Sequence, residues 1–432
     1  PKHRMRSTYG GIMLHNSGLI DGRRHAKAPI GEGKPRFYEP RLNGLAAVRI
    51  DGRTMYAGNS EVFERPLVSV TVDPKRPYVV DLFRMDGGRK WREYMLLGSY
   101  RHRSEAAMSV TFEKLPGVRP LMRKGAKWDD GGKDDVKYDD PYGLFTNVRA
   151  GPKSKNFKLT YTLQDTWREK ENDPGEPVDL CRDPAKPPVG MVNHFIGMPD
   201  ATPYLADIPR RVDKPGPTTA MEQMPQLIFR DEGIDSESQF VCVHEPFKGQ
   251  PAIREVRRLP ADGNALVLRI EFEDGRVDLV LMATDGNPLR YDADGILTDA
   301  KLAVISQPAE GRPEAWMIGG TRLVANKIGV SLKKEAAGFQ GRIVRSFRKW
   351  DGDSFDGFEV VGGTLPSNGD SLAGASIMVD NQGVQDEFHD RIINGSIEDW
   401  YQKYHSRSPL AKEERRQENP ASEDVLNWEA NQ

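Results

Sequence analysis

Hydrophobic and polar residues alternate along most of this chain, which is the pattern of half-buried β-strands. The alternation is clear in FKLTYTLQDT at residues 157–166, and in the neighbouring segments ALVLRIEFE and RVDLVLMAT at residues 265–273 and 276–284. Asp274 and Gly275 separate the last two segments. An Asp-Gly dipeptide between alternating segments predicts a β-hairpin with a two-residue turn, because glycine and aspartate tolerate the positive φ angles of that turn.

Short segments of the same kind recur as far as residue 379, and they include residues 45–50, 53–56, 78–85 and 91–99. The chain also contains 42 Gly and 31 Pro, which separate these segments as turn residues do. Many short strands with almost no amphipathic helix predict an all-β fold, and more specifically a large multi-sheet antiparallel β-sandwich.

Three segments interrupt the strand pattern, at residues 119–144, 168–189 and 207–225. They are rich in charged residues and in Gly or Pro, and strand patterns resume on both sides of each. We therefore predict that they are long surface loops rather than linkers.

One or two short helices are predicted near the C-terminus. Ser396 can cap the first of them, Asp399 lies at the capping-box position, and Ile397, Trp400 and Tyr401 give it an apolar side. Residues 1–405 are predicted to form a single sandwich domain, followed by a polar tail at 406–432.

Composition narrows the classes of function. The 432 residues carry a formal net charge of −2, which favours neither a nucleic acid nor an acidic partner. No apolar run approaches the ~18 residues of a membrane-spanning helix, so membrane insertion is not expected. The two cysteines, Cys181 and Cys242, leave both a disulfide and two free thiols open, and the oligomeric state cannot be read from the sequence.

Few residues carry a recognisable chemical pattern. His244 next to Glu245 is compatible with a catalytic pair, although a structural histidine is the better interpretation of spacing alone. His194 is interpreted as a strand residue. The basic tripeptide at residues 101–103 is interpreted as a solvated turn. The Asp-rich segment at 129–140 is interpreted as a solvated loop, because it lacks the residue order of a calcium-binding loop.

A family resemblance rests on three blocks of sequence. HNSGLIDGRR, starting at His15, resembles the HNT-[VL]-x-[VI]-D-G element of the heparinase II/III-like superfamily of polysaccharide lyases, with departures at Ser17 and Gly18. RPYVVDLFRMDGGRKWREYMLLGS resembles a second block of that family, although Leu97-Gly98 stands where the family has His-Gly. SQFVCVHEPFKG followed by IREVRRL resembles a third block. The blocks occur in the family's order and together span roughly residues 10–285.

This resemblance implies an enzyme in which an α/α toroid precedes a β-sandwich, with an anionic polysaccharide bound between them. It implies β-elimination on a uronic acid, in which a Tyr or His removes the C5 proton and another protonates the departing O4 oxygen. The chain begins with Pro1 and reaches the first block at residue 15, so we expect it to be the sandwich part of a larger exported enzyme, active in the periplasm, at the cell envelope or as a secreted protein, and inactive alone. Alginate and glycosaminoglycans are both substrates of such enzymes, and catalytic residues are not assigned.

The family also holds a divalent metal, usually zinc, in its sandwich, and the histidine of the HN element is commonly a ligand. By resemblance, His15 is therefore the predicted metal ligand of this chain. Two other functions stay open: a uronyl C5-epimerase of the same architecture, and a non-catalytic carbohydrate-binding sandwich. An anionic polysaccharide is the expected partner in each case.

Overall fold

The computed structural model describes residues 16–22, 33–122 (apart from 43, 57–58 and 99–103), 141–166 (apart from 154–155), 180–181, 187–197, 201–211, 221–331 (apart from 234–235, 290, 294 and 326–327), 342–347 and 357–361. The chain divides into two compact units. The first comprises Pro1–Ala26 and Gly33–Glu335, and the second comprises Lys27–Glu32 and Ala336–Gln432.

The described part of the second unit is one antiparallel hairpin, formed by β26 (Arg342–Phe347) and β27 (Gly357–Val361). The predicted C-terminal helix and the predicted domain boundary after residue 405 lie outside the described residues. These two expectations therefore stay predictions.

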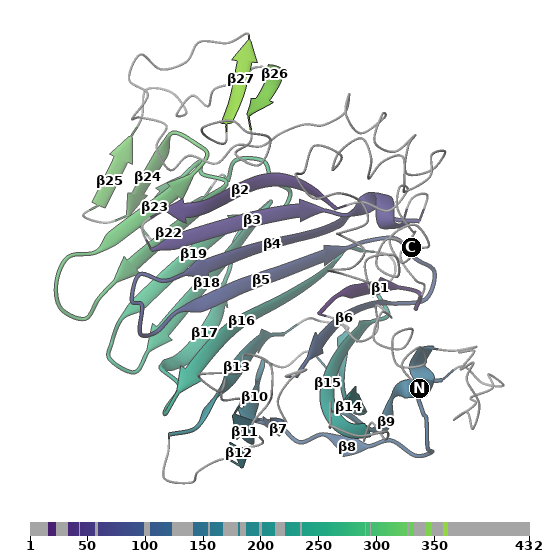
Figure 1. Ribbon diagram of the computed structural model, residues 1–432. Coiled ribbons are helices and arrows are strands. Elements are labelled where there is room, and N and C mark those ends of the chain that lie inside the picture. The colour runs from purple at the N-terminus through teal and green to yellow at the C-terminus, as the bar shows by residue number, and fades with distance from the viewer. Residues whose placement is uncertain are drawn as a thin grey trace, which may run out of the picture. The chain divides into compact units, whose positions relative to one another are not determined.

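The predicted all-β sandwich is confirmed in the first unit, whose described strands pair in antiparallel sheets (Figure 1). The largest sheet has eight strands. In spatial order they are β2 (Lys34–Leu42), β3 (Leu45–Asp51), β4 (Phe63–Val70), β5 (Tyr78–Met85), β16 (Ser238–Lys248), β13 (Val189–Ile196), β10 (Phe157–Leu163) and β7 (Ser104–Met108).

Two further sheets pack on this one. The six-stranded sheet has the order β1 (Gly18–Ile20), β6 (Arg92–Leu97), β15 (Met221–Asp231), β14 (Ala201–Arg211), β9 (Thr146–Ala150) and β8 (Glu113–Lys114). The five-stranded sheet has the order β17 (Ile253–Leu259), β18 (Ala265–Phe272), β19 (Val277–Ala283), β22 (Leu302–Gln307) and β23 (Glu314–Ile318).

Smaller sheets complete the described part of this unit. Four short strands form one of them, in the order β20 (Tyr291–Ala293), β21 (Ile296–Thr298), β24 (Arg322–Ala325) and β25 (Ile328–Ser331). Residues of this sheet share an apolar cluster with the five-stranded sheet. A two-stranded ribbon joins β11 (Asp165–Thr166) to β12 (Leu180–Cys181).

The central strands of the eight-stranded sheet are covered on both faces. Along β5, Val80 and Leu82 belong to the apolar cluster shared with the five-stranded sheet, whereas Phe83 and Met85 belong to the cluster shared with the six-stranded sheet. Successive side chains of a strand point to opposite faces. Asp81 therefore shares its face with Phe83 and lies between the eight- and six-stranded sheets, where it is 1% exposed.

Three local predictions differ from the structure. Residues 53–56 form a 3-10 helix, η2 (Arg53–Tyr56), instead of a strand, because the Asp51 side chain accepts the Arg53 amide hydrogen and turns the chain. The hairpin between β18 and β19 has a longer loop than predicted, in which Gly275 has a positive φ of 88° and Asp274 does not. Residues 207–225 include the ends of β14 and β15, which pair from Ala201 opposite Asp231 to Arg211 opposite Met221.

Candidate functional site

The first and second blocks of the resemblance are joined by a strand pair and by an aspartate. β1 pairs with β6, so that Leu19 lies opposite Glu93. Beyond β1, the Asp21 carboxylate accepts the amide hydrogens of Arg89, Lys90 and Trp91, with its Oδ1 2.7 Å from the Lys90 nitrogen. Asp21 has a φ of 54°, which is uncommon for a residue other than glycine and which aspartate tolerates better than most.

The second and third blocks are joined inside the eight-stranded sheet. β5 pairs with β16, with Asp81 opposite Cys242 and Val79 opposite His244. Three segments that are far apart in the sequence therefore pack as neighbouring strands of two sheets. Their sequences resemble blocks of one family, but these contacts could not be predicted from the sequence.

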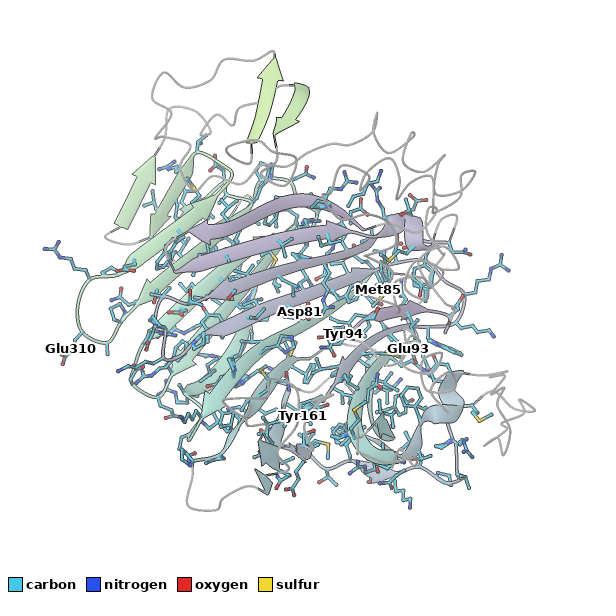
Figure 2. The ribbon with its side chains drawn as sticks, viewed as in Figure 1. Asp81, Met85, Glu93, Tyr94, Tyr161 and Glu310 are labelled. Carbon is cyan, nitrogen blue, oxygen red and sulfur yellow. The ribbon has the colours of Figure 1, made fainter. Side chains whose placement is uncertain are left out.

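Asp81 is the centre of a buried polar cluster at this junction, which we call the Asp81 cluster and which consists of Arg65, Asp81, Tyr94, Asn193, Cys242 and His244. Arg65 on β4 binds both carboxylate oxygens, with Nε 3.0 Å from Oδ1 and Nη2 2.7 Å from Oδ2. The Tyr94 hydroxyl of β6 donates to Oδ2 at 2.8 Å, and Figure 2 shows Asp81 and Tyr94 on their two strands. The cluster thus connects the two sheets by charge and by hydrogen bonds.

The cluster also holds the segment that follows His15. Arg65 Nη1 donates to the Asn16 carbonyl oxygen at 2.6 Å, and the Asn16 side-chain oxygen accepts the Leu97 amide hydrogen at 2.7 Å. His15 itself lies outside the described residues. In the sequence it directly precedes Asn16, the residue that Arg65 contacts.

Burial and nearby charges determine the protonation states of Asp81 and Tyr94. Burial alone would raise the pKa of Asp81, but Arg65 and His244 outweigh it and hold that pKa well below its usual range. Burial, with the Asp81 charge as a further cause, raises the pKa of the Tyr94 hydroxyl well above its usual value. Near neutral pH Asp81 is therefore ionised and Tyr94 keeps its proton, so Tyr94 acts here as a hydrogen-bond donor and not as a general base.

His244 belongs to this cluster and not to a pair with Glu245. Its Nε2 lies 3.3 Å from Asp81 Oδ2 and its Nδ1 lies 2.7 Å from Asn193 Oδ1. The neighbouring Glu245 points to the opposite face of β16, where it lies 2.9 Å from His194 Nε2. The sequence interpretation of His244 as a structural residue agrees with these contacts, although it lies in a strand and not in a loop.

The pair formed by His194 and Glu245 has a structural role. Glu245 Oε1 accepts the amide hydrogens of Ala252 and Ile253, the latter at 2.8 Å, and so holds the start of β17 against the eight-stranded sheet. Burial lowers the pKa of His194 despite the favourable Glu245 charge. His194 is 3% exposed and packed within its strand, as the sequence indicated.

Cys242 does not form a nucleophilic dyad with His244, although its sulfur lies 3.6 Å from the ring Nδ1. Burial raises the pKa of the thiol well above its usual value, and the side chain is 1% exposed. A buried neutral thiol with no access to solvent is unreactive. Cys242 is a free thiol, and nothing is described of the Cys181 side chain.

A further buried cluster lies on the outer face of the six-stranded sheet. Glu93, which is fully buried, accepts hydrogen bonds from Arg230 Nε at 2.7 Å and from the Tyr142 hydroxyl. The Arg230 guanidinium lies 4.5 Å from the centre of the Trp91 ring and 5.6 Å from that of Tyr204. No pattern in the sequence predicted this cluster, because its members come from four separate segments. The aromatic rings enclose the arginine of the protein itself, so the cluster supports packing.

The described residues do not supply a metal site. Over the part of the chain that the structure describes, no three His, Cys, Asp or Glu residues converge so that they could hold a metal ion. Arg65, which contacts the Asn16 carbonyl oxygen, binds both oxygens of the Asp81 carboxylate. The basic tripeptide at residues 101–103 and the Asp-rich segment at 129–140 lie outside the described residues.

Comparisons with known proteins give distant structural similarity only. No known protein family and no curated protein matches the chain. The crystal structure of heparan sulfate lyase HepC from Pedobacter heparinus matches with a TM-score of 0.37 and 12% identity, over 65% of this chain and 32% of that chain. A heparinase III gene product matches with a TM-score of 0.37 and 10% identity, over 65% and 31% of the two chains. A crystal structure of heparinase III matches with a TM-score of 0.35 and 10% identity, over the same shares.

The chain thus spans about one third of the length of these solved proteins. Among the described elements of this chain, no helix is both long enough and apolar enough to cross a membrane.

Proposed function

We propose that this chain is the β-sandwich part of a polysaccharide lyase, which cleaves a uronic-acid-containing anionic polysaccharide by β-elimination. One observation carries the proposal: the three segments that resemble the lyase family pack against one another, with β1 on β6 and β5 beside β16. The Asp81 cluster lies where they meet. The three blocks that resemble the lyase family are separate in the sequence, but their strands lie side by side in the same sandwich.

The chemistry of the reaction assigns this unit a supporting role. β-elimination requires that the uronate carboxylate be neutralised, that a base remove the C5 proton and that an acid protonate O4. Within the described residues, the Asp81 cluster holds an ionised carboxylate and a protonated tyrosine, both buried. It orients the Asn16 segment through Arg65 and does not itself exchange the substrate proton.

The first test of this proposal follows the product. A lyase leaves a C4–C5 double bond on the new end, which absorbs in the ultraviolet. The full open reading frame that contains this chain, and the 432-residue chain alone, would be incubated with alginate, heparan sulfate and chondroitin sulfate. We expect absorbance to rise with the full form on at least one glycan.

Other outcomes discriminate the remaining functions. Exchange of the C5 hydrogen with deuterated solvent, without a rise in absorbance, would indicate an epimerase. Binding of a glycan without either reaction would indicate a carbohydrate-binding module. Either result would overturn the lyase proposal.

The metal remains a separate prediction. His15 needs further ligands, and the described residues do not provide them. We expect the purified full form to contain about one equivalent of zinc by mass spectrometry. The His15→Ala variant should contain much less, and equal metal content in the two proteins would remove the assignment of His15. Action outside the cytoplasm follows from the family resemblance and from the size of the proposed substrate, and secretion of the tagged full form would test it.

A further inference from the structure

The outer face of the five-stranded sheet carries arginines at the edge formed by β17 (Figure 1). Val256 of β17 and Ile270 of β18 are opposite each other and belong to the apolar cluster shared with the eight-stranded sheet. Side chains alternate along a strand, so the next pair, Arg257 opposite Arg269, lies on the outer face.

Arg254 reaches the same face through a β-bulge. The register of β17 on β18 shifts between Ile253 and Glu255, so that Arg254 is an extra residue of β17. A bulge redirects the side chain of such a residue, and Arg254 Nη2 donates to the Glu271 carboxylate of β18. We call this group the β17 arginine surface, and it consists of Arg254, Arg257 and Arg269.

A single carboxylate, that of Glu271, holds all three guanidinium groups. Arg269 Nε donates to Oε1 at 2.7 Å, Arg257 Nη2 donates to the same oxygen, and Arg254 Nη2 donates to Oε2. These hydrogen bonds lower the pKa of Glu271 to about 2, so the carboxylate is ionised at neutral pH. A guanidinium has five N–H donors, so Glu271 orients the three arginines without using most of their donors.

The charge that this surface presents to solvent is mainly positive. The three arginine side chains are between 35% and 55% exposed, whereas that of Glu271 is 8% exposed. Lys158 adds a fourth cation, since its Nζ donates to the carbonyl oxygen of Arg254 at 3.0 Å. Two exposed carboxylates, those of Glu255 and Glu273, offset part of this charge. Four cations therefore stand against three carboxylates, one of which is buried.

The arrangement of the arginines favours an external anion. Like charges directly opposite each other destabilise a sheet, and Arg257 and Arg269 form such a pair. An anion that accepts hydrogen bonds from two guanidinium groups would offset this repulsion. The aromatic residue of β17 and β18 is Phe272, which is 1% exposed, so these two strands offer no ring on which nucleic-acid bases could stack.

We propose that the β17 arginine surface binds the carboxylate or sulfate groups of an anionic polysaccharide. The class of partner rests on the proposed function, since such a polymer presents these groups repeatedly along one chain. Arginine keeps its proton at physiological pH, so these residues bind the polymer without exchanging protons with it. Binding is therefore tested separately from cleavage.

Loss of charge on this surface should weaken binding. Arg254→Gln combined with Arg257→Gln removes two exposed cations and leaves Arg269 to hold Glu271. Binding of the 432-residue chain to labelled heparan sulfate and alginate oligosaccharides would be measured by fluorescence anisotropy at low ionic strength. We expect about tenfold weaker binding of at least one glycan. Loss for heparan sulfate alone would identify sulfate as the bound group, and loss for alginate would identify carboxylate.

A matched control removes the same charge elsewhere. Arg36→Gln combined with Arg89→Gln replaces an exposed arginine of β2 and another in the turn before β6. It should change the affinity less than about twofold, because solvent and salt screen distant charges. Equal weakening by the two double variants would show an effect of net charge alone and would overturn the inference.

A variant that gains affinity excludes a folding defect as the cause. Glu255→Gln removes the exposed carboxylate beside Arg257, and it should tighten binding about two- to fivefold. Glu113→Gln removes an exposed carboxylate from β8 of the six-stranded sheet and should leave the affinity unchanged. An unchanged affinity in Glu255→Gln would contradict the proposed role of this surface.

Binding and cleavage give independent answers. Absence of elimination product with the full form would overturn the lyase proposal and leave the difference in binding between these variants standing. Failure of the wild-type chain to bind either glycan would overturn the inference. Equally tight binding of double-stranded DNA of similar length would overturn it as well, because the surface would then recognise any polyanion.

Discussion

Replacement of Asp81 by alanine should lower the free energy of unfolding by about 3–5 kcal/mol, because it leaves a partly buried guanidinium without its counter-charge. Asp81 is 1% exposed and accepts hydrogen bonds from both Arg65 and Tyr94. Urea denaturation followed by tryptophan fluorescence would measure the change. The stability that Asp81 contributes is present above its unfolded-state pKa of about 3.9 and is lost as the pH falls below it, since the folded-state pKa is depressed.

Asp274→Ala is the matched control for this substitution. Asp274 also forms an ion pair with an arginine, Arg76, but the two side chains are 43% and 36% exposed. Exposed pairs contribute about 0–1 kcal/mol. Similar losses in the two variants would show that the Asp81 cluster does not stabilise the junction of the sheets.

Phe195→Ala is expected to have an effect of similar size for a different reason. Phe195 is 2% exposed and lies between Phe157 and Phe229, with ring centres 5.1 and 4.8 Å away. Phe229 belongs to the six-stranded sheet and the other two belong to the eight-stranded sheet, so the substitution opens a cavity between the sheets. Loss of a buried phenylalanine costs about 3–5 kcal/mol, which a thermal or urea unfolding curve would detect.

Val189→Ala on the same strand provides the comparison. Val189 is 36% exposed, and its truncation should change stability by less than about 0.5 kcal/mol. If Phe195→Ala were equally mild, the apolar cluster between the two sheets would not be a close-packed core. The two variants together therefore test the packing of the sheets independently of the Asp81 cluster.

Strand positions were largely predictable from the sequence, because the alternation of side chains records which face of a sheet is covered. The segment predicted at 78–85 has the bounds of β5, and the segments before and after Asp274-Gly275 are β18 and β19. Predictions from composition were weaker. Residues 207–225 were predicted to be a loop, yet hydrogen bonds between two strands of 11 residues each extend β14 and β15 into them.

The Asp81 cluster could not be predicted in this way. Asp81 and Tyr94 are in one block of the resemblance, but Arg65 lies outside all three blocks and Asn193 comes from yet another strand. Only the order and register of the strands bring them together. The adjacency of His244 and Glu245 was misleading for the same reason, since neighbours along a strand point to opposite faces.

Pairing of β5 with β16 also affects the order in which the chain can fold during synthesis. His244 and Asp81 are 163 residues apart in sequence. At a translation rate of about 5–20 residues per second, β5 leaves the ribosome roughly 8–30 s before its partner strand. Throughout that interval the hydrogen-bonding edge of β5 has no partner from β16 and is open to strands of other nascent chains.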